Sequence, residues 1–226
     1  MKSTVALFAL PLVLWSCHEA SVKPGINADF LNPDLDVESM IARFETESRE
    51  IAKERVRIAD AVGIRTGQSV ADIGAGTGLF TGLFASRVGP GGKVYAVDVS
   101  APFIEHLEVK IRESGMSQVQ AVLCKEDSVE LAEGSVDVAF ICDTYHHFEY
   151  PASTMGSLHR AVRPGGSLVV IDFHRVVGER GDWVLEHIRA SQDVFTAEIE
   201  AAGFQFVEEV EIEGLAENYF LRFERK

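Results

Sequence analysis

The sequence has few cysteines and few cations, and each shortage excludes a class of protein. Only 3 cysteines stand among its 226 residues. A chain of this length suits one domain and buries roughly 70% of the surface that its unfolded form exposes, so it needs no disulfide or metal to hold its fold. The 21 Lys and Arg against 35 Asp and Glu give a net charge of -14. That balance disfavours nucleic acid as a partner, because such binding depends on cations that neutralise phosphates.

The sequence also lacks an apolar run long enough to cross a bilayer. Its longest early run, Val5 to Trp15, follows a single cation, Lys2. A bilayer requires ~20 residues, whereas the apolar core of a secretory signal has ~7–15. The segment LWSC, which ends at Cys17, resembles the lipobox of bacterial lipoproteins, although Trp15 departs from the usual pattern. The resemblance implies cleavage before Cys17 and a lipid anchor on it.

The domain is expected to begin downstream of this leader. Residues 18–35 contain two prolines, one glycine and two asparagines, a composition that favours a linker. We therefore expect a signal peptide at residues 1–17, a linker at 18–35 and one domain at 36–226. A functional leader would place the protein in the periplasm or on a membrane as a lipoprotein. A leader that does not function would leave it in the cytoplasm.

Apolar runs alternate with amphipathic stretches along this domain. Residues 36–62 have helical periodicity with a polar interruption at 47–50, which predicts two helices. Five strands are then expected, at 70–73, 94–97, 119–123, 136–141 and 167–173, with helices at 77–88, 102–114 and 151–162 and a turn at 163–166. The alternation predicts an α/β fold with a parallel sheet and helices on both faces. A last helix at 194–202 precedes a predicted antiparallel hairpin at 206–212 and 219–223.

The stretch VADIGAGTGLF (70–80) places three glycines in five positions directly after the first strand. Glycine accepts positive φ and lets another group approach the main chain. Ligands of open α/β sheets bind at the carboxyl ends of the strands, so this turn is a candidate cofactor site. A dinucleotide fingerprint requires glycine where Leu79 stands, and Asp72 would repel a pyrophosphate. A nicotinamide oxidoreductase is therefore disfavoured.

The segment VADIGAGTG resembles motif I of class I S-adenosylmethionine-dependent methyltransferases, and further motifs follow in the family's order. VYAVDVS (94–100) is similar to the second-strand motif, and KEDSVELAEGSVDVAF (125–140), CDTYHHFEYP (142–151) and LHRAVRPGGSLVVIDF (158–173) resemble later segments. The pattern is most similar to ubiquinone/menaquinone-type small-molecule methyltransferases. The resemblance implies a doubly wound, seven-stranded, mostly parallel sheet of order 3-2-1-4-5-7-6 with strand 7 antiparallel.

The same resemblance assigns S-adenosylmethionine to particular residues. The methionine part would lie on the glycine turn, with Asp72 near its ammonium group; the turn residues are Gly74, Ala75, Gly76 and Gly78. Asp98 would bind the ribose hydroxyls beside Val99, and a helix cap or turn is its structural alternative. Asp127 and Ser128 would meet adenine, although Glu126 replaces the family's usual glycine and Asp127 could equally be a turn residue. Asp143 completes the set.

The methyl acceptor is expected to be a small molecule, and the sequence leaves open whether O, N, C or S is methylated. Transfer requires alignment and exclusion of water, and a base helps where the acceptor is a phenol or an acidic carbon. The candidates after the fourth strand are Asp143, Tyr145, His146 and His147. Neighbouring side chains point apart in regular structure, so we expect only one histidine, His146, to face the pocket. The alternative function is an S-adenosylmethionine-binding sensor or accessory protein without catalysis.

Three further features complete the expectations. His174 follows the fifth strand and is a weaker candidate, and the loop at 174–183 is expected to cover the substrate. A metal site of Asp143, Asp172 and His174 is disfavoured, because the Asp-Asn pair of magnesium-dependent O-methyltransferases is missing. The Asn/Asp-Pro-Pro-aromatic motif of adenine and glutamine N-methyltransferases is absent too. Cys124 and Cys142 are expected to stay unpaired, because the implied strand order puts about 14 Å between them.

Overall fold

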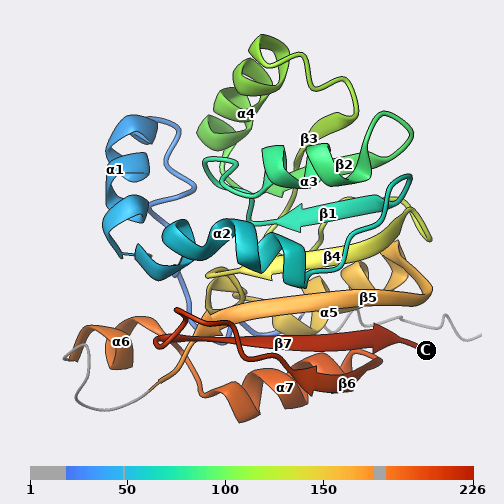
Figure 1. The fold of residues 1–226 in the computed structure, drawn as a ribbon. Helices are drawn as coiled ribbons and strands as arrows, with labels where there is room; N and C mark the ends of the chain where they lie inside the picture. Colours follow the sequence, from blue (N-terminus) through green and yellow to red (C-terminus); the bar gives the residue numbers. More distant parts are fainter. Residues whose placement is uncertain (1–18, 48, 176–181) are drawn as a thin grey trace, which may run out of the picture.

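A seven-stranded sheet of order β3-β2-β1-β4-β5-β7-β6 forms the centre of the computed structural model, which describes residues 19–47, 49–175 and 182–226 (Figure 1). The strands are β1 (Ser69–Ile73), β2 (Lys93–Asp98), β3 (Val119–Leu123), β4 (Val136–Cys142), β5 (Val162–Phe173), β6 (Phe204–Glu209) and β7 (Asn218–Arg225). Strands β1 to β5 pair in parallel, and β7 is antiparallel to both β5 and β6. The predicted strand order and the predicted reversal of strand 7 are therefore confirmed.

Helices cover both faces of the sheet because its central strands are apolar on both sides. One face packs against α2 (Arg49–Ala61), α3 (Thr81–Val88) and α4 (Ala101–Glu113), and the other against α5 (Pro151–Ala161) and α7 (Gln192–Ala201). Within β4, Phe140 faces the first layer and Ile141 the second, and both are fully buried. Side chains of a strand alternate between its two faces, so one short run supplies both cores.

Three short elements lie beyond the carboxyl ends of the parallel strands. Figure 1 shows helices α1 (Val37–Glu47) and α6 (Asp182–His187) at the left, where the arrow of β1 points. A 3₁₀ turn, η1 (Tyr145–His147), follows β4 at the same edge. Ligands of open α/β sheets bind at this edge, so these three elements surround the expected site.

Some boundaries differ from the sequence-based expectation. Helix α3 begins at Thr81 rather than at residue 77, because the glycine turn continues as far as Phe80. Strand β5 begins at Val162, and residues 163–166 form a bulge within it: Val136 pairs with Val162, but Val138 already pairs with Ser167. The predicted turn at 163–166 is thus contained in the strand.

Residues 19–35 differ most from the prediction, because they pack on the domain instead of leading away from it as a linker. The Glu19 carboxylate accepts hydrogen bonds from the first amides of α5, and Val22 N donates to the Glu149 carbonyl. Asn27 is only 5% exposed. Residues 19–35 form neither a helix nor a strand, in agreement with their prolines and glycine, but composition does not report these long-range hydrogen bonds.

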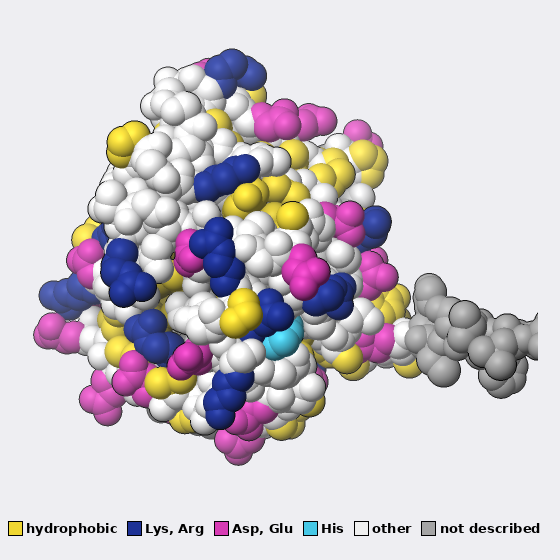
Figure 2. Space-filling model, turned by 90° about the vertical axis from the view of Figure 1, so that its right-hand side faces the viewer, with side chains coloured by type: hydrophobic (Ala, Val, Ile, Leu, Met, Phe, Trp, Pro, Cys, Tyr) yellow, Lys and Arg dark blue, Asp and Glu magenta, His cyan; other side chains and the backbone are white. Residues whose placement is uncertain are grey.

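The opposite edge of the sheet has a mixed surface. Figure 2 views the face at the amino ends of the parallel strands, where Lys and Arg side chains are interspersed with Asp and Glu. Within the described ranges, no helix combines the length and the apolar character that a bilayer crossing requires. The predicted signal peptide with its Cys17 lies outside the described residues, as does most of the loop at 174–183.

Both cysteines of the domain are free, as the strand order predicts. Cys124 follows β3 and Cys142 ends β4, and β2 and β1 lie between these two strands. Burial raises the pKa of the Cys124 thiol to about 12 and the pKa of the Cys142 thiol well above its usual value. Neither thiol is therefore a nucleophile near neutral pH.

Candidate functional site

The glycine turn after β1 is held by β2 and by α4. The amides of Gly74 and Ala75 both donate to the Val97 carbonyl, at 2.8 and 3.0 Å. From α4, Lys110 Nζ donates to the carbonyls of Thr77 and Gly78, at 2.9 and 3.2 Å. These bonds leave the turn little freedom before any ligand arrives.

The three glycines are required for two different reasons. All three have positive φ, at +72° for Gly74, +51° for Gly76 and +74° for Gly78. A Cβ on Gly74 would lie 2.3 Å from Thr144 Cγ2, and one on Gly78 would lie 2.8 Å from Leu107 Cδ2. The groups that approach these two glycines thus belong to the chain itself. Only Gly76 has room, since the nearest side-chain atom to its Cβ position is 3.7 Å away.

Two buried carboxylates flank this turn. Asp98 Oδ2 accepts the Gly76 amide at 2.8 Å, and its Oδ1 accepts the Ser100 amide at 2.9 Å. Burial raises the Asp98 pKa to about 6, against the opposing effect of these amides. Asp72 accepts the Thr81 hydroxyl at 2.7 Å, and burial raises its pKa to about 7. Both groups are consequently poised to ionise fully when a cation or a set of hydroxyls arrives.

A cleft of about 380 Å³ opens beyond the ends of β2 and β3. Its lining residues are Leu31, Val99, Ala101, Leu123, Cys124, Lys125 and Glu126. Its volume lies within the range of small-molecule sites, about 300–1,000 Å³. Of the residues predicted to bind the cofactor, Val99 lines the cleft, whereas Asp127 and Ser128, which were expected to meet adenine, are not among the lining residues. They form the tight turn that follows, in which Lys125 and Ser128 pair through their backbones.

The end of β4 brings the candidate catalytic residues to the glycine turn. Thr144, which contacts Gly74, stands between Asp143 and η1. Asp143 has a φ of +47°, rare for a residue other than glycine. Its carboxylate accepts the side-chain amide of Asn218 on β7. Backbone strain of this kind accumulates at functional sites.

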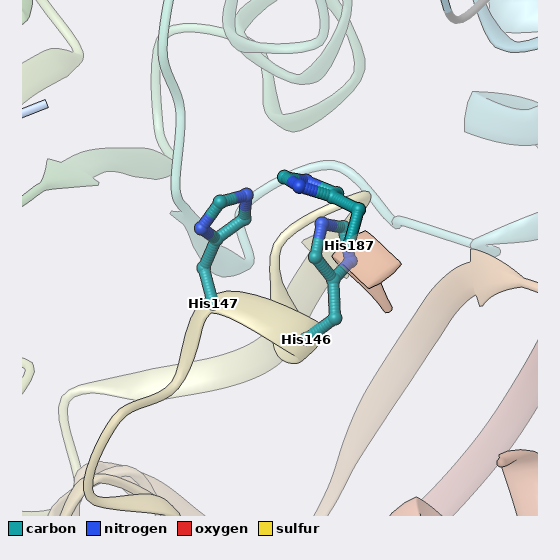
Figure 3. A group of neighbouring side chains, drawn as sticks. All are labelled: His146, His147 and His187. Carbon is teal, nitrogen blue, oxygen red and sulfur yellow. The ribbon is translucent and has the colours of Figure 1, made fainter. Parts of the chain in front are cut away.

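The rings of His146, His147 and His187 lie together at this point (Figure 3). The ring centroids of the first two are 4.4 Å apart, and each lies 5.0 Å from that of His187. The expectation that only one of the adjacent histidines faces the pocket is therefore wrong. Its premise was regular structure, whereas η1 is a single 3₁₀ turn that lets both rings turn toward α6.

Asp172 at the end of β5 fixes His146. Its Oδ1 lies 2.8 Å from His146 Nδ1, and its Oδ2 accepts the His146 amide at 3.1 Å. Burial raises the Asp172 pKa to about 7 and lowers the His146 pKa to about 3. At neutral pH His146 is thus an uncharged ring that directs its Nδ1 toward Asp172 and its Nε2 into the site.

His174 and Asp143 are not members of this three-histidine cluster. His174 packs its ring against Tyr219 at 5.5 Å, and its amide donates to the Glu217 carbonyl. Asp143 contacts Asn218, while Asp172 contacts His146. Among the described residues, only His146, His147 and His187 lie close enough together to share a metal ion, and Asp143, Asp172 and His174 do not form such a group.

Sequence reasoning missed four residues that shape the site: Asn27, Lys110, Thr144 and His187. Asn27 Nδ2 donates to Glu126 Oε1 and to the His147 carbonyl, both at 3.1 Å. Thr144 stands inside the segment CDTYHHFEYP but was not singled out there, and no local motif marks the other three, because each acts on a segment distant in sequence. Only the run of small side chains at 74–78 indicates that something packs on that turn.

Comparisons with known proteins agree with this geometry. Residues 71–170 match the family described as "Methyltransferase domain". The chain is 32% identical over 111 residues to an uncharacterized 37.1 kDa protein in transposon TN4556 of Streptomyces fradiae. The matched region covers 49% of this chain and 32% of that protein. The chain is 28% identical over 121 residues to the ubiquinone/menaquinone biosynthesis C-methyltransferase of Escherichia fergusonii, covering 53% and 48%. The chain thus spans less than half the length of these two relatives.

The fold has a solved counterpart of almost the same extent. A crystal structure of an S-adenosylmethionine-dependent methyltransferase from Aquifex aeolicus superposes with a TM-score of 0.67 and 21% identity, covering 89% of this chain and 93% of that one. At that identity the likeness shows the fold alone.

The residues present fit S-adenosylmethionine. Each Asp98 oxygen accepts one amide and so keeps a lone pair for a ribose hydroxyl. The Ser100 hydroxyl is buried without a hydrogen-bond partner in the described part of the chain. The cleft beside Val99 offers apolar walls to a base, and Asp72 offers a negative charge to a cation. Over residues 71–170 the chain thus matches the family of methyltransferase domains, and the residues of its site fit S-adenosylmethionine as cofactor.

Proposed function

We propose that the protein transfers a methyl group to a small molecule held between η1 and α6. One observation carries the proposal: Thr144 packs directly on Gly74, so the segment with the histidines begins at the cofactor turn. Asn27 also connects the cleft to the histidine segment, because its side-chain amide donates to Glu126 Oε1 of the cleft and to the His147 carbonyl. A methyl donor and an acceptor would thus lie side by side.

The cover over this edge supports a small acceptor. The ring centroid of Phe30 lies 6.5 Å from that of Phe44 on α1 and 6.3 Å from that of Phe103 on α4. It lies 5.2 Å from the ring centroid of His147, with the two rings edge to face. These rings close the side of the site next to the cofactor turn, which excludes water as methyl transfer requires. Their aromatic surfaces favour an acceptor with an apolar body and one polar group for the histidines. The curated relative from Escherichia fergusonii, by its name, acts in quinone biosynthesis.

The chain's own groups have three tasks in this reaction. S-adenosylmethionine, when bound, supplies the methyl group as a sulfonium substituent. Asp98, which is held by the Gly76 and Ser100 amides, would position its ribose, and the negative charge of Asp72 would pair with its cationic end. His146 keeps its Nε2 as a hydrogen-bond acceptor toward the acceptor group, because Asp172 holds Nδ1. With a pKa of about 3, His146 orients a proton more readily than it removes one.

Turnover by the purified full chain tests the proposal. The protein is incubated with S-adenosylmethionine carrying a deuterated methyl group and with a small-molecule cell extract, and mass spectrometry searches for labelled products. We expect S-adenosylhomocysteine and one labelled small molecule in equal amounts. Parallel incubations with DNA, RNA and protein fractions should remain unlabelled.

The same experiment separates the proposal from its alternative. A sensor or accessory protein would bind the cofactor in calorimetry but form no S-adenosylhomocysteine in any fraction. Label found only in a macromolecular fraction would contradict the small-molecule acceptor while leaving the methyltransferase intact.

A further inference from the structure

The strongest feature that the methyltransferase fold leaves unexplained is the set of three histidine rings at the acceptor side. One ligand atom from each of His146, His147 and His187 lies within 4.8 Å of the other two. The residues come from two segments, η1 and α6, which the fold brings together across 40 positions of sequence. Cofactor binding and methyl transfer by themselves require no such gathering of imidazoles.

We propose that His146, His147 and His187 form a zinc site with an open fourth position directed at the methyl acceptor. Neutral imidazole is a preferred ligand of Zn²⁺. Three protein ligands with one open position form the usual arrangement of catalytic zinc. The role of the fourth position rests on the proposed methyl transfer, whereas the metal site itself does not.

The spacing is close to what a metal requires. Tetrahedral zinc with Zn–N bonds of about 2.0–2.1 Å holds its nitrogen ligands about 3.3 Å apart. The three ligand atoms lie at most 4.8 Å apart. To bind one zinc ion, each pair of these atoms must therefore approach by no more than about 1.5 Å. Figure 3 shows the three rings turned toward one another with nitrogens on their facing sides. Small side-chain rotations can close this distance without moving the sheet.

Asp172 supplies the supporting contact that metal-binding histidines commonly have. A ligating histidine usually donates its second ring N–H to a carboxylate or a carbonyl, which fixes its orientation and makes it a stronger ligand. Asp172 Oδ1 lies 2.8 Å from His146 Nδ1, and both residues are buried. Nε2 of His146 is thereby left for the metal.

The surroundings supply both an apolar wall and an access route. Phe30 lies edge-on to His147 and Phe173 edge-on to His146. His146 is 2% exposed, but His147 and His187 are only half-buried, so an ion can reach the rings from their side. Nδ1 of His147 is buried without a hydrogen-bond partner among the described residues.

Nearby charges set the strength of the site. Lys23 donates to the carbonyls of Glu186 and His187, and Lys23 and Arg189 act as cations on the cluster. Arg189 is paired with Glu198 through two bonds, at 2.8 and 2.6 Å. The Asp172 carboxylate, 2.8 Å from His146 Nδ1, supplies an acidic group in direct contact with the rings. A dication on three neutral rings and one such carboxylate is a usual balance for a zinc centre.

The open position has a chemical consequence for the acceptor. A hydroxyl or thiol bound to zinc loses its proton more easily, because the metal stabilises the resulting anion. The proton leaves to solvent through the half-buried side, and the anion then supplies the electron pair for the new bond to the methyl carbon. The sulfur of the cofactor keeps the electrons of the bond that breaks. With zinc bound, the metal takes the place of the direct hydrogen bond between the acceptor group and His146 Nε2, and no base is needed from His146.

Zinc binding by the untagged full chain tests the proposal without any methyl transfer. After treatment with a chelator, the protein is dialysed against ZnCl₂ and its zinc is counted by mass spectrometry. We expect one zinc per chain, at least tenfold weaker binding in His187→Gln, and a 10- to 100-fold loss in Asp172→Asn. His106→Gln, which removes a histidine of α4 outside the site, is the matched control and should bind as the wild type does.

Several outcomes would overturn the proposal. These are a wild-type chain that takes up no zinc, or a His187→Gln variant that binds as tightly as the control. X-ray absorption of the zinc-loaded wild type needs no variant, and a first shell with fewer than three imidazoles would also reject the site. Zinc bound without any methyl transfer would contradict the proposed function alone, and methyl transfer by a zinc-free chain would contradict this inference alone.

Discussion

Replacing Asp98 with Asn tests whether a buried charge is kept for the cofactor at a cost to the fold. Burial raises the Asp98 pKa from 3.8 to about 6, and that difference corresponds to about 3 kcal/mol. A raised pKa means that the folded state disfavours the charged form. The contribution of this group to the free energy of unfolding is therefore complete below pH 3.8 and is lost as the pH rises through about 6.

The variant removes this penalty but introduces a mismatch. Its side-chain NH₂ must face one of the two amides, of Gly76 or Ser100, that now donate to the carboxylate. A mismatched buried donor costs about 1–3 kcal/mol. The two effects nearly cancel, so at pH 7 we expect a free energy of unfolding within about 2 kcal/mol of wild type.

Cofactor affinity should respond far more strongly. Hydrogen bonds to a charged group contribute about 1.5–3 kcal/mol, so without the carboxylate the dissociation constant of S-adenosylhomocysteine should rise roughly 10- to 150-fold. Isothermal titration calorimetry at pH 7.5 measures the affinity, and urea denaturation at pH 4.5 and 7 measures the stability. The matched control is Asp60→Asn, because Asp60 is an exposed acid paired with Arg87.

Three results would refute the reasoning. Wild-type affinity in the variant would remove Asp98 from the cofactor site. A loss of stability above about 4 kcal/mol would show that the carboxylate is kept for the fold instead. Reduced affinity in Asp60→Asn as well would show that net charge, and not the buried group, decides the effect.

Three further predictions concern the glycine turn, α4 and the leader. Gly74→Ala should lower the free energy of unfolding by about 2–4 kcal/mol in urea denaturation, and adding Thr144→Ala should recover part of this loss. Gly76→Ala should lower it only by the ~1–2 kcal/mol that its positive φ costs. Equal losses in Gly74→Ala and Gly76→Ala would contradict the contact between Gly74 and Thr144. Lys110→Met should weaken S-adenosylhomocysteine binding about 5- to 30-fold in calorimetry, because two turn carbonyls lose their donor; unchanged binding would mean that the turn needs no support from α4. Cys17→Ala should release the protein from the membrane fraction or block its processing, and a wholly soluble wild type that keeps its first methionine would reject the lipid anchor.

The sheet could be predicted from the sequence because its signals are local. Each apolar run is bounded by glycine, proline or a change of period, and Gly74 to Gly78 mark the cofactor turn. What failed depended on contacts between distant segments. Residues 19–35 have the composition of a linker, yet they hydrogen-bond α5 and α6. The position of His187 beside His147 depends on how α6 returns to the sheet, which no periodicity records.

The candidate site divides in the same way. The expectation for Asp98 came from the resemblance of VYAVDVS to the family's second-strand motif, and the structure places this carboxylate against the Gly76 amide of the glycine turn. The three-histidine cluster could not be predicted, since the rule of alternating side chains applies to strands and not to a single 3₁₀ turn. Asp143 shows the same limit, because its positive φ follows from the Asn218 contact and from the start of η1.

Because residues 19–35 contact several parts of the site, their susceptibility to a protease reports whether a ligand is bound there. This one peptide bonds the start of α5 through Glu19, α6 through Lys23, and the cleft through Asn27. A protease must first detach it locally, and detachment breaks contacts on both sides of the pocket. Any ligand that needs those contacts slows cleavage here by the factor 1 + [L]/Kd. Limited proteolysis of this segment therefore offers a screen for methyl acceptors that requires no knowledge of the product.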